Sequence, residues 1–296
     1  MAAQASAVAV RPVLGIVAAL AAVYLVWGST YLAIRVAVEA YPPFLMGAMR
    51  MGAAGLLMYA VLRWRGVAPP TRAQWRTLVV LSIFMVLLSN GLVNVAEQQV
   101  SSGLAAIAVA SMPLWAALFS LLRGQHPSRG EWLGLSIGFV GVLWLNAGSE
   151  LAATPKGMLA LLVAPVAWAW GSIWSRSLTL PTPFMSAAGQ MICGSGWMLA
   201  TGLTLGERLG PWPGWTPTLA VVYLSVFGSF VAFSAYVWLL QHVRPALATS
   251  YAYVNPLIAV LLGVLLLGER FSPQALGAMT VILAGVVIIT LSRAKR

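Results

Sequence analysis

Residues 26–35 read VWGSTYLAIR, and residues 169–176 read AWGSIWSR. Both stretches interrupt a long apolar run with Trp-Gly-Ser, and both carry a second aromatic residue four positions after the tryptophan. The two tryptophans, Trp27 and Trp170, lie 143 residues apart in a chain of 296. A motif that recurs after half the chain length indicates that the sequence consists of two related halves.

The same offset aligns other residues along the chain. Pro113-Leu114 aligns with Pro256-Leu257, and Gln98 aligns with Gln241. Chance pairs of Ala and Leu are common in an apolar chain, so the Trp-Gly-Ser and Pro pairs are the informative ones. We predict two domains from this repeat, residues 1–150 and residues 151–296.

The composition indicates that most of the chain faces lipid. Hydrophobic residues make up 60% of it, charged residues only 8%, and the mean hydropathy is +0.89, whereas a globular domain carries roughly 25% charged residues. Apolar stretches of about 18 residues or more can cross a bilayer as helices. Ten such stretches are predicted, at residues 12–36, 43–62, 74–96, 101–122, 130–148, 157–178, 184–205, 217–240, 246–267 and 273–292.

Helices rather than strands are predicted to form these spans. Strands of a membrane barrel alternate apolar and polar residues over about ten positions, whereas these stretches are apolar on every side. The connections are short, several contain proline, and none is long enough to be a domain. The predicted fold class is an all-α polytopic membrane protein with ten transmembrane helices.

The basic residues predict the orientation of the helices. With ten helices threaded in order, the side that holds both termini receives twelve of the seventeen Lys and Arg residues, and the opposite side receives five of the six acids. Such a bias over short loops is the positive-inside pattern, so both termini are expected to be cytoplasmic in a multi-pass plasma-membrane protein, a bacterial inner-membrane protein. The net charge of +11 is explained in this way, and no nucleic-acid partner is expected.

Five helices in each half require the second half to be inverted relative to the first, because five is an odd number. Inverted repeats are typical of secondary transporters, which place their site near the middle of the membrane between the halves. Two equivalent halves can open a central cavity to one side and, by exchanging conformations, to the other. A duplicated membrane scaffold without transport is the alternative.

The two ends of the chain resemble a known domain. VWGSTYLAIRVAVEAYPPFLMGAMR is similar to the first two helices of an EamA domain, and YVNPLIAVLLGVLLLGERFSPQALGAMTVILAGVVII is similar to its last two. Two such domains in tandem resemble the drug/metabolite transporter superfamily, and amino-acid exporters of the YddG type in particular. This resemblance implies a central cavity surrounded by helices 1, 3, 4, 6, 8 and 9, with helices 2, 5, 7 and 10 as supports. The first half departs from the pattern, with Gly124-Gln125-His126 where the second has Gly268-Glu269-Arg270.

Polar and aromatic side chains inside the spans are the candidate substrate ligands. Polar groups are costly in lipid and usually face a cavity or a neighbouring helix, and amides can both donate to and accept from a zwitterion. Contacts between helices are the alternative role for these amides, as packing is for the tryptophans. The predicted substrate-binding residues are Trp27, Tyr31, Asn90, Asn94, Trp168, Trp170, Ser172, Ser229, Tyr236, Tyr251 and Asn255.

Glycine and proline mark candidate hinges. A proline inside a helix removes one backbone hydrogen bond, so Pro113 and Pro256 are predicted gating positions, with a static bend as the alternative. Gly28 and Gly171, in the spans at 12–36 and 157–178, are also predicted gating or hinge positions, because glycine permits close approach of two helices. Arg50, inside the second span, could capture a substrate carboxylate, but a structural pairing or a snorkelling role is favoured.

These features predict a secondary carrier that works by alternating access. The expected cargo is amino acids, aromatic ones included, and related small metabolites that move outward. The alternatives are a multidrug or quaternary-cation exporter, a purine-type exporter, a channel, and, more distantly, an integral-membrane enzyme. No metal-ligand spacing or nucleotide-binding loop is present, so no metal, cofactor or enzymatic activity is expected.

The acids bear on how transport is coupled. The chain has no Asp, and no Glu falls clearly in the middle of a span, although proton-coupled carriers commonly use intramembrane carboxylates. Facilitated or exchange transport is therefore predicted. The expected partners are a small-molecule substrate and the lipid bilayer, and one chain of ten helices is enough to form a cavity.

Overall fold

The computed structural model of the protein describes residues 2–100, 105, 108–147, 154–267 and 273–292. The secondary-structure elements of this part are all helices, in agreement with the predicted fold class. The predicted domain boundary at residue 150 and the Gly268-Glu269-Arg270 turn lie outside the described residues. Five helical spans of the described chain are long and apolar enough to cross a membrane, namely Val13–Val38, Pro43–Trp64, Arg72–Ala96, Pro155–Ser175 and Trp215–His242.

The first half begins with two long helices and continues with a third span built from three consecutive elements. The helices are α1 (Ala2–Val38), α2 (Pro43–Trp64), α3 (Arg72–Ser82), η1 (Ile83–Gly91), α4 (Leu92–Ala96), α6 (Met112–Leu122) and α7 (Arg129–Leu145). The second half repeats this order with α8 (Pro155–Ser175), α9 (Pro183–Thr204), α10 (Trp215–Tyr223), η2 (Leu224–Phe233), α11 (Ser234–His242), α12 (Pro245–Thr249), α13 (Tyr251–Leu267) and α14 (Pro273–Leu291).

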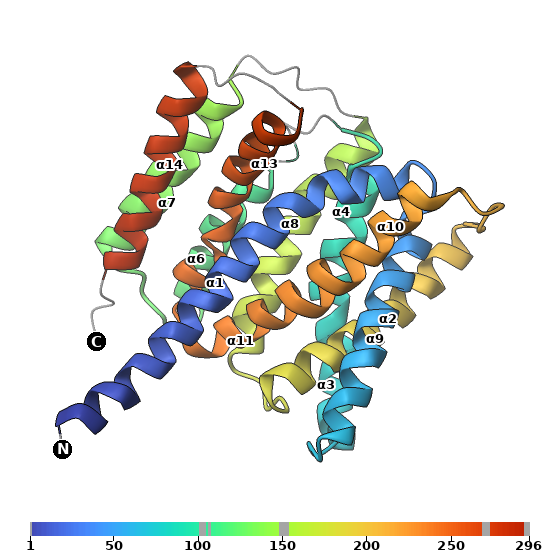
Figure 1. Ribbon diagram of the computed structural model, residues 1–296, viewed down its shortest axis with the longest axis horizontal. Helices are drawn as coiled ribbons and strands as arrows, with labels where there is room; N and C mark the ends of the chain where they lie inside the picture. Colours follow the sequence, from blue (N-terminus) through green and yellow to red (C-terminus); the bar gives the residue numbers. More distant parts are fainter. Residues whose placement is uncertain (1, 101–104, 106–107, 148–153, 268–272, 293–296) are drawn as a thin grey trace.

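Two helix pairs flank the molecule, and each pair takes one helix from each half. Figure 1 shows α7 beside α14 at one edge and α2 beside α9 at the opposite edge. These are the helices that the family resemblance assigns to a supporting role. The remaining spans lie between the two pairs and form the centre of the molecule.

Glycines allow the α7–α14 pair to pack at backbone distance. A Cβ atom on Gly285 would lie 2.6 Å from the backbone nitrogen of Gly138 and 2.8 Å from the carbonyl oxygen of Gly134. Gly134 and Gly138, four residues apart on α7, thus pack against the last helix of the other half.

The central helices also pack across the two halves in matching pairs. α1 packs on α13 and on η2 of the second half, while α8 packs on α6 and on η1 of the first half. Exchanging the halves exchanges one set of contacts for the other. Such packing is what a two-fold relation between inverted repeats produces.

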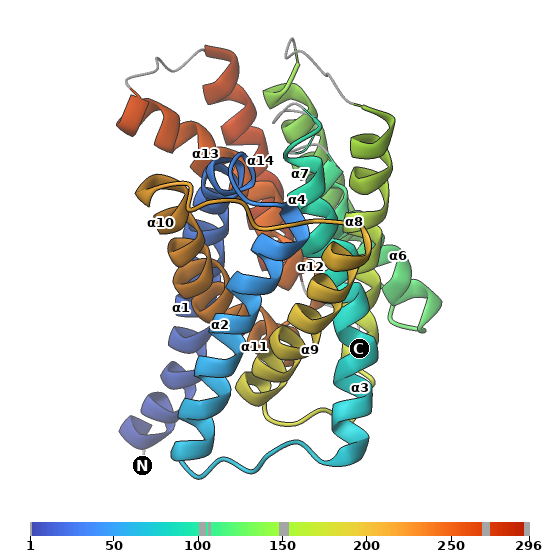
Figure 2. The same cartoon turned by 90° about the vertical axis from the view of Figure 1, so that its right-hand side faces the viewer.

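The helix ends divide between two faces of the molecule. In Figure 2, the start of α1 and the link from α2 to α3 lie at one end, and the link from α9 to α10 lies at the other. The link from α2 to α3 carries the exposed basic residues Arg65 and Arg72. The face with the start of α1 is therefore basic, as the threading of the helices predicted.

The third span of each half contains a π-helical segment, η1 in the first half and η2 in the second. Both segments begin and end within two residues of the 143-residue register. A π-helix bonds i to i+5, widens the helix, and is frequent at functional sites. In η1 the side chain of Asn90 donates to the carbonyl oxygen of Met85, five residues earlier, at 3.0 Å.

Candidate functional site

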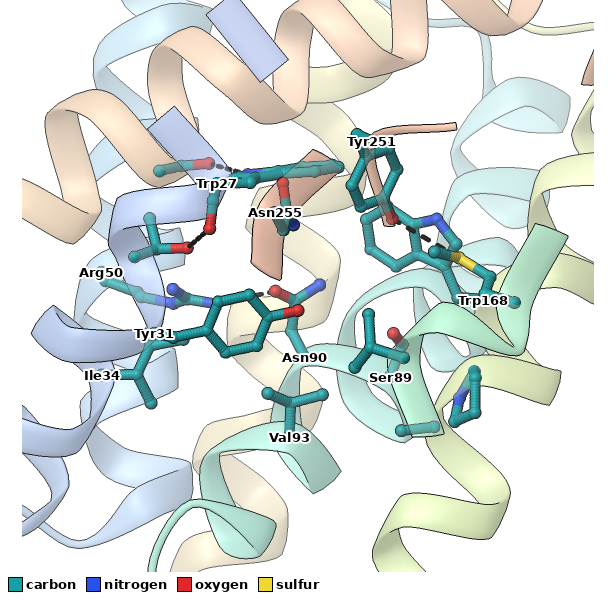
Figure 3. A pocket seen from close by; sticks show the side chains of 16 residues that line it. Trp27, Tyr31, Ile34, Arg50, Ser89, Asn90, Val93, Trp168, Tyr251 and Asn255 are labelled. Atoms are coloured by element: carbon teal, nitrogen blue, oxygen red, sulfur yellow. Dashed lines mark hydrogen bonds between the residues drawn. The ribbon is translucent and has the colours of Figure 1, made fainter. Parts of the chain in front are cut away.

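A cavity lies between the two halves at the level of the π-helical segments. It has a volume of about 80 Å³, which is room for several water molecules. Figure 3 shows the side chains that line it. They are Trp27, Thr30, Tyr31, Ile34, Arg50, Ser89, Asn90, Val93, Val109, Met112, Ala164, Pro165, Trp168, Gly228, Tyr251 and Asn255.

Arg50 carries the charge of the cavity wall. Its side chain is 3% exposed, and its Nη2 donates to Asn90 Oδ1 at 2.7 Å. Because the amide nitrogen of Asn90 is bound to Met85, the amide oxygen is held toward the guanidinium. Neither of the two ion pairs within the described residues includes Arg50.

Aromatic residues from both halves form the opposite part of the wall. The Trp27 ring lies 5.4 Å from that of Trp168 and 4.6 Å from that of Tyr251, with edge-on geometry in both pairs. The indole nitrogen of Trp27 donates to the carbonyl oxygen of Gly228 in η2 at 3.0 Å. Edge-to-face contacts of this kind stabilise aromatic clusters, so these three rings form a packed surface beside the cavity.

Three buried polar atoms on the wall have no hydrogen-bond partner within the described structure. They are Arg50 Nε and Trp168 Nε1, which are donors, and Asn255 Oδ1, which is an acceptor. Buried polar groups are normally paired with protein, water or ligand. Arg50, Trp168 and Asn255 thus line the cavity with polar side chains, and in each of them one polar atom is buried without a partner.

Five predicted substrate-binding residues lie outside the lining. Asn94 is buried and donates to the carbonyl oxygen of Pro43 at 3.1 Å. Ser172 and Tyr236 are bonded to each other at 2.8 Å behind the Trp168 ring, whose centroid lies 5.0 Å from that of Tyr236. Ser229 is fully buried in η2, and Trp170 is half-buried against Phe119.

The predicted hinge residues occupy tightly packed positions in the central helices. Cβ atoms on the two glycines would fall 2.5 Å from Ile258 Cβ at Gly28 and 2.8 Å from Met85 Sδ at Gly171. Pro256 lies inside α13, whereas Pro113 is the second residue of α6, directly after a break in the helix at Ser111. The helical stretch Ala108–Leu122 is thus interrupted directly before Pro113, and whether either proline acts in gating stays a prediction.

Two arginines clamp helix ends at opposite faces. Arg35 Nη2, on α1, donates to the carbonyl oxygens of Glu97 and Val100 after α4, at 3.4 and 3.2 Å. Arg176, at the end of α8, donates to the carbonyl oxygens of Leu240 and Val243. The accepting residues match at an offset of 143 in both cases, so the two clamps are equivalent in the repeat. We name them by their place along α1: the outer clamp (Arg35 with Glu97 and Val100) lies at the face where α1 ends, and the inner clamp (Arg176 with Leu240 and Val243) lies at the opposite face.

The two clamps differ in one carboxyl group. Glu97 has Leu240 as its counterpart. Glu97 follows the span Arg72–Ala96, is 5% exposed, and lies 3.9 Å from Arg35 Nε. It is thus a buried acid directly after the span. Burial raises the pKa of this carboxyl to about 7, and the positive charge of Arg35 partly offsets the rise.

Sequence reasoning missed Arg50 as a lining residue, because helix 2 was assigned a supporting role. An arginine inside an apolar span without a nearby acid in the sequence was the available signal. Pro165 and Ser89 were also missed. Both line the cavity from α8 and η1, respectively.

The chain is similar to proteins of known family over most of its length. The sequence profile of the EamA-like transporter family matches residues 13–147 and again residues 155–291. An Escherichia coli K12 protein named as the uncharacterized inner membrane transporter YedA is 41% identical over 284 residues, which cover 96% of this chain and 93% of that protein. The uncharacterized transporter YdfC of Bacillus subtilis is 26% identical over 248 residues, covering 82% and 80% of the two chains.

A protein of known crystal structure shares the fold. Its TM-score to this chain is 0.77 at 23% sequence identity, over 95% of this chain and 98% of that one. Together with the two profile matches, these likenesses give a single assignment. The protein is a membrane protein that belongs to the EamA-like transporter family, within the drug/metabolite transporter superfamily.

Proposed function

We propose that the protein is a secondary carrier that exports amino acids, aromatic ones included, and related small metabolites by alternating access. The observation that carries this proposal is the cavity between the halves, whose lining combines Arg50, Asn90 and Asn255 with three aromatic rings. An amino acid offers the complementary set: acceptors on its carboxylate, donors on its ammonium group, and a side chain that can pack on the rings.

The charge of the wall favours amino acids over the cationic alternative. Arg50 is the one formally charged residue among the described lining. A quaternary cation would meet a buried positive charge in a medium of low dielectric constant, which is unfavourable. A zwitterion can turn its carboxylate toward that charge.

Exchange or facilitated transport is part of the proposal. None of the described carboxylates lines the cavity, since the lining contains neither Asp nor Glu. A proton relay through the site would need such a group. Uptake that requires an imposed proton gradient, at fixed voltage and fixed substrate gradient, would contradict this part.

The orientation follows from the basic face. We place that face, with both termini, in the cytoplasm of a bacterial cell, with the inner membrane around the helices. The partners are then a small-molecule substrate and lipid, and one chain supplies both walls of the cavity. Protease or thiol accessibility of each terminus in intact cells tests this orientation.

A substrate panel tests the function. The purified chain is reconstituted in liposomes, and efflux of aromatic, aliphatic and charged amino acids is compared with efflux of a quaternary cation. We expect saturable efflux of the amino acids, accelerated by the same amino acid on the opposite side, because a carrier shows countertransport and a pore does not. Movement of the cation alone would contradict the proposed cargo.

A further inference from the structure

Arg50 is a buried cation whose charge the described protein does not neutralise. A guanidinium has five N–H donors, yet Arg50 makes one side-chain hydrogen bond to the described residues, from Nη2 to Asn90. Its Nε has no partner. Burying a charge is costly unless an opposite charge and hydrogen bonds compensate it.

The described acids are all engaged elsewhere or exposed. Glu97 faces Arg35, and Glu131 is paired with Arg244 at 2.7 Å. Glu207 accepts the backbone N–H groups of Phe44 and Leu45 at the start of α2, at 3.2 and 2.9 Å. Glu39 is exposed at the end of α1. Among the described residues no acid is left to balance Arg50, and the route that they leave open to an anion is the cavity that Arg50 lines.

The wall matches an anion with one negative charge. One arginine among the described lining residues supplies one positive charge, which suits a carboxylate better than a phosphate dianion. A guanidinium also meets a carboxylate with two parallel hydrogen bonds, and such charge-assisted pairs are roughly twice as strong as neutral ones. Asn90 holds the guanidinium through Nη2, so the N–H groups that make no hydrogen bond to the described residues are left for the ligand.

The other unpaired groups place the rest of the ligand. Asn255 Oδ1 accepts hydrogen bonds and suits an ammonium group. Trp27 and Tyr251 present ring edges and faces to the same space. The charged head and the apolar body of the ligand thus have different partners, which Figure 3 shows close together: Arg50 lies beside Tyr31, and Asn255 lies between Trp27 and Tyr251.

We infer that Arg50 is the residue that binds the carboxylate of the transported molecule, and that the site selects monocarboxylates, α-amino acids among them, over their uncharged amides and esters. This inference rests on the proposed carrier function and adds its selectivity. It also assigns a substrate contact to helix 2, which otherwise supports the cavity from outside.

Binding to the purified full chain tests the inference without transport. The probes are phenylacetate, phenylacetamide, L-phenylalanine and L-phenylalaninamide, added in detergent while thermal unfolding is followed. The wild type is expected to bind each carboxylate about 10- to 100-fold more tightly than its amide, the range given by one or two hydrogen bonds to a charged group. Equal binding of acid and amide, or no binding of either acid, would overturn the inference.

Variants assign the preference to Arg50. Arg50→Gln is expected to abolish the discrimination between acid and amide. Arg50→Lys keeps the charge without the two-pronged geometry, and it is expected to weaken carboxylate binding about tenfold while retaining the preference. Arg72→Gln, at an exposed arginine outside the cavity, is the matched control. If Arg50→Gln does not fold, Arg50→Lys decides, because wild-type affinity in that variant would contradict a role for the guanidinium.

Transport assays separate this inference from the proposed function. If phenylacetate binds through Arg50 but no amino acid is carried into liposomes, the carboxylate site stands and the amino-acid cargo is wrong. If amino acids are carried and Arg50→Gln transports acid and amide in the wild-type ratio, the cargo stands and the assignment of Arg50 is wrong.

Discussion

Trp27 shows how one side chain can serve both halves of the molecule. Its nitrogen donates to Gly228 in η2 of the second half, and its ring contacts those of Trp168 and Tyr251. All of these partners belong to residues after 154. Trp170, its counterpart in the repeat, contacts Phe119 and does not line the cavity. Equivalent positions in the sequence have therefore acquired different surroundings.

Replacing these two tryptophans should have different effects. Trp27→Ala removes a ring from the centre of the cluster and the donor to Gly228, so we expect a loss of about 3 kcal/mol in stability and loss of transport. Trp170→Ala, the same substitution at the equivalent position of the repeat, is the control. We expect an unchanged KM for this variant because Trp170 does not line the cavity. Thermal unfolding and countertransport in liposomes provide the two readouts. Trp27→Phe keeps an aromatic ring in the cluster and removes the indole N–H. An unchanged KM in a folded Trp27→Phe variant would show that this N–H serves packing alone and not substrate binding.

The sequence predicted the aromatic part of the site better than its charged part. Trp27, Trp168 and Tyr251 were chosen because they lie deep in spans, and depth is readable from hydropathy. The direction in which a side chain points depends on how the helix is rotated. Ser172 and Arg50 show the consequence, since the first turns behind a ring and the second turns into the cavity.

At the scale of the elements, the closely packed helix pairs flank the molecule, and the π-helical segments contribute residues to the cavity. The flanking pair α7–α14 is held at backbone contact through glycines. The third span of each half contains a π-helical segment whose residues reach the cavity, Asn90 in η1 and Gly228 in η2. Such segments have no period of their own in the sequence, so the span at 74–96 was predicted as one regular helix.

A methyl group added at the α7–α14 contact should separate the pair. In Gly285→Ala the new Cβ would lie 2.6 Å from the Gly138 nitrogen, and we expect a loss of about 1–3 kcal/mol, as for overpacked cores. Gly196→Ala in α9 is the control, because nothing lies within 4 Å of its new Cβ. There we expect a gain of up to about 1 kcal/mol from helix propensity. Equal unfolding temperatures for the two variants would contradict the packing argument.

At the scale of the whole molecule, the outer and inner clamps sit at the two ends of the central helices. Both are formed in this structure. Each ties the end of the first helix of one half to the end of the third helix of the same half. Opening the cavity toward either face should therefore require the release of the clamp at that face.

Removing one clamp should shift access to the cavity. The readout is the labelling rate of Ile34→Cys, a lining position, by an impermeant thiol reagent from outside, with Cys193→Ser to remove the native cysteine. We expect Arg35→Ala to raise the rate and Arg176→Ala to lower it, by about tenfold for a loss of hydrogen bonding of ~1.4 kcal/mol. If both variants raised the labelling rate, or both lowered it, the two clamps would not control access from opposite faces.

The outer clamp should also respond to pH. The pKa of Glu97 is about 7 while the group is buried, and exposure to water returns it toward the ordinary value for Glu, ~4.3. Protonation therefore favours the closed clamp, and a rise of external pH through about 7 favours its release. Labelling of any cysteine rises with pH because the thiolate reacts, so the rate is compared with that of Ile34→Cys in the Glu97→Gln background at each pH. We expect the ratio of the two rates to rise as the pH passes about 7. A ratio that does not change with pH would place the titrating group elsewhere.

Two identical halves would leave a carrier resting equally often at each face. The replacement of Glu97 by Leu240 in the inner clamp removes that balance with a single side chain. In the orientation and direction of transport that we propose, it gives the external solution, but not the cytoplasm, a means to set the waiting conformation. The final distribution of cargo is fixed by its gradient and is unaffected. What changes is kinetic: an acidic exterior would hold the empty carrier closed to the outside and slow the return of exported molecules.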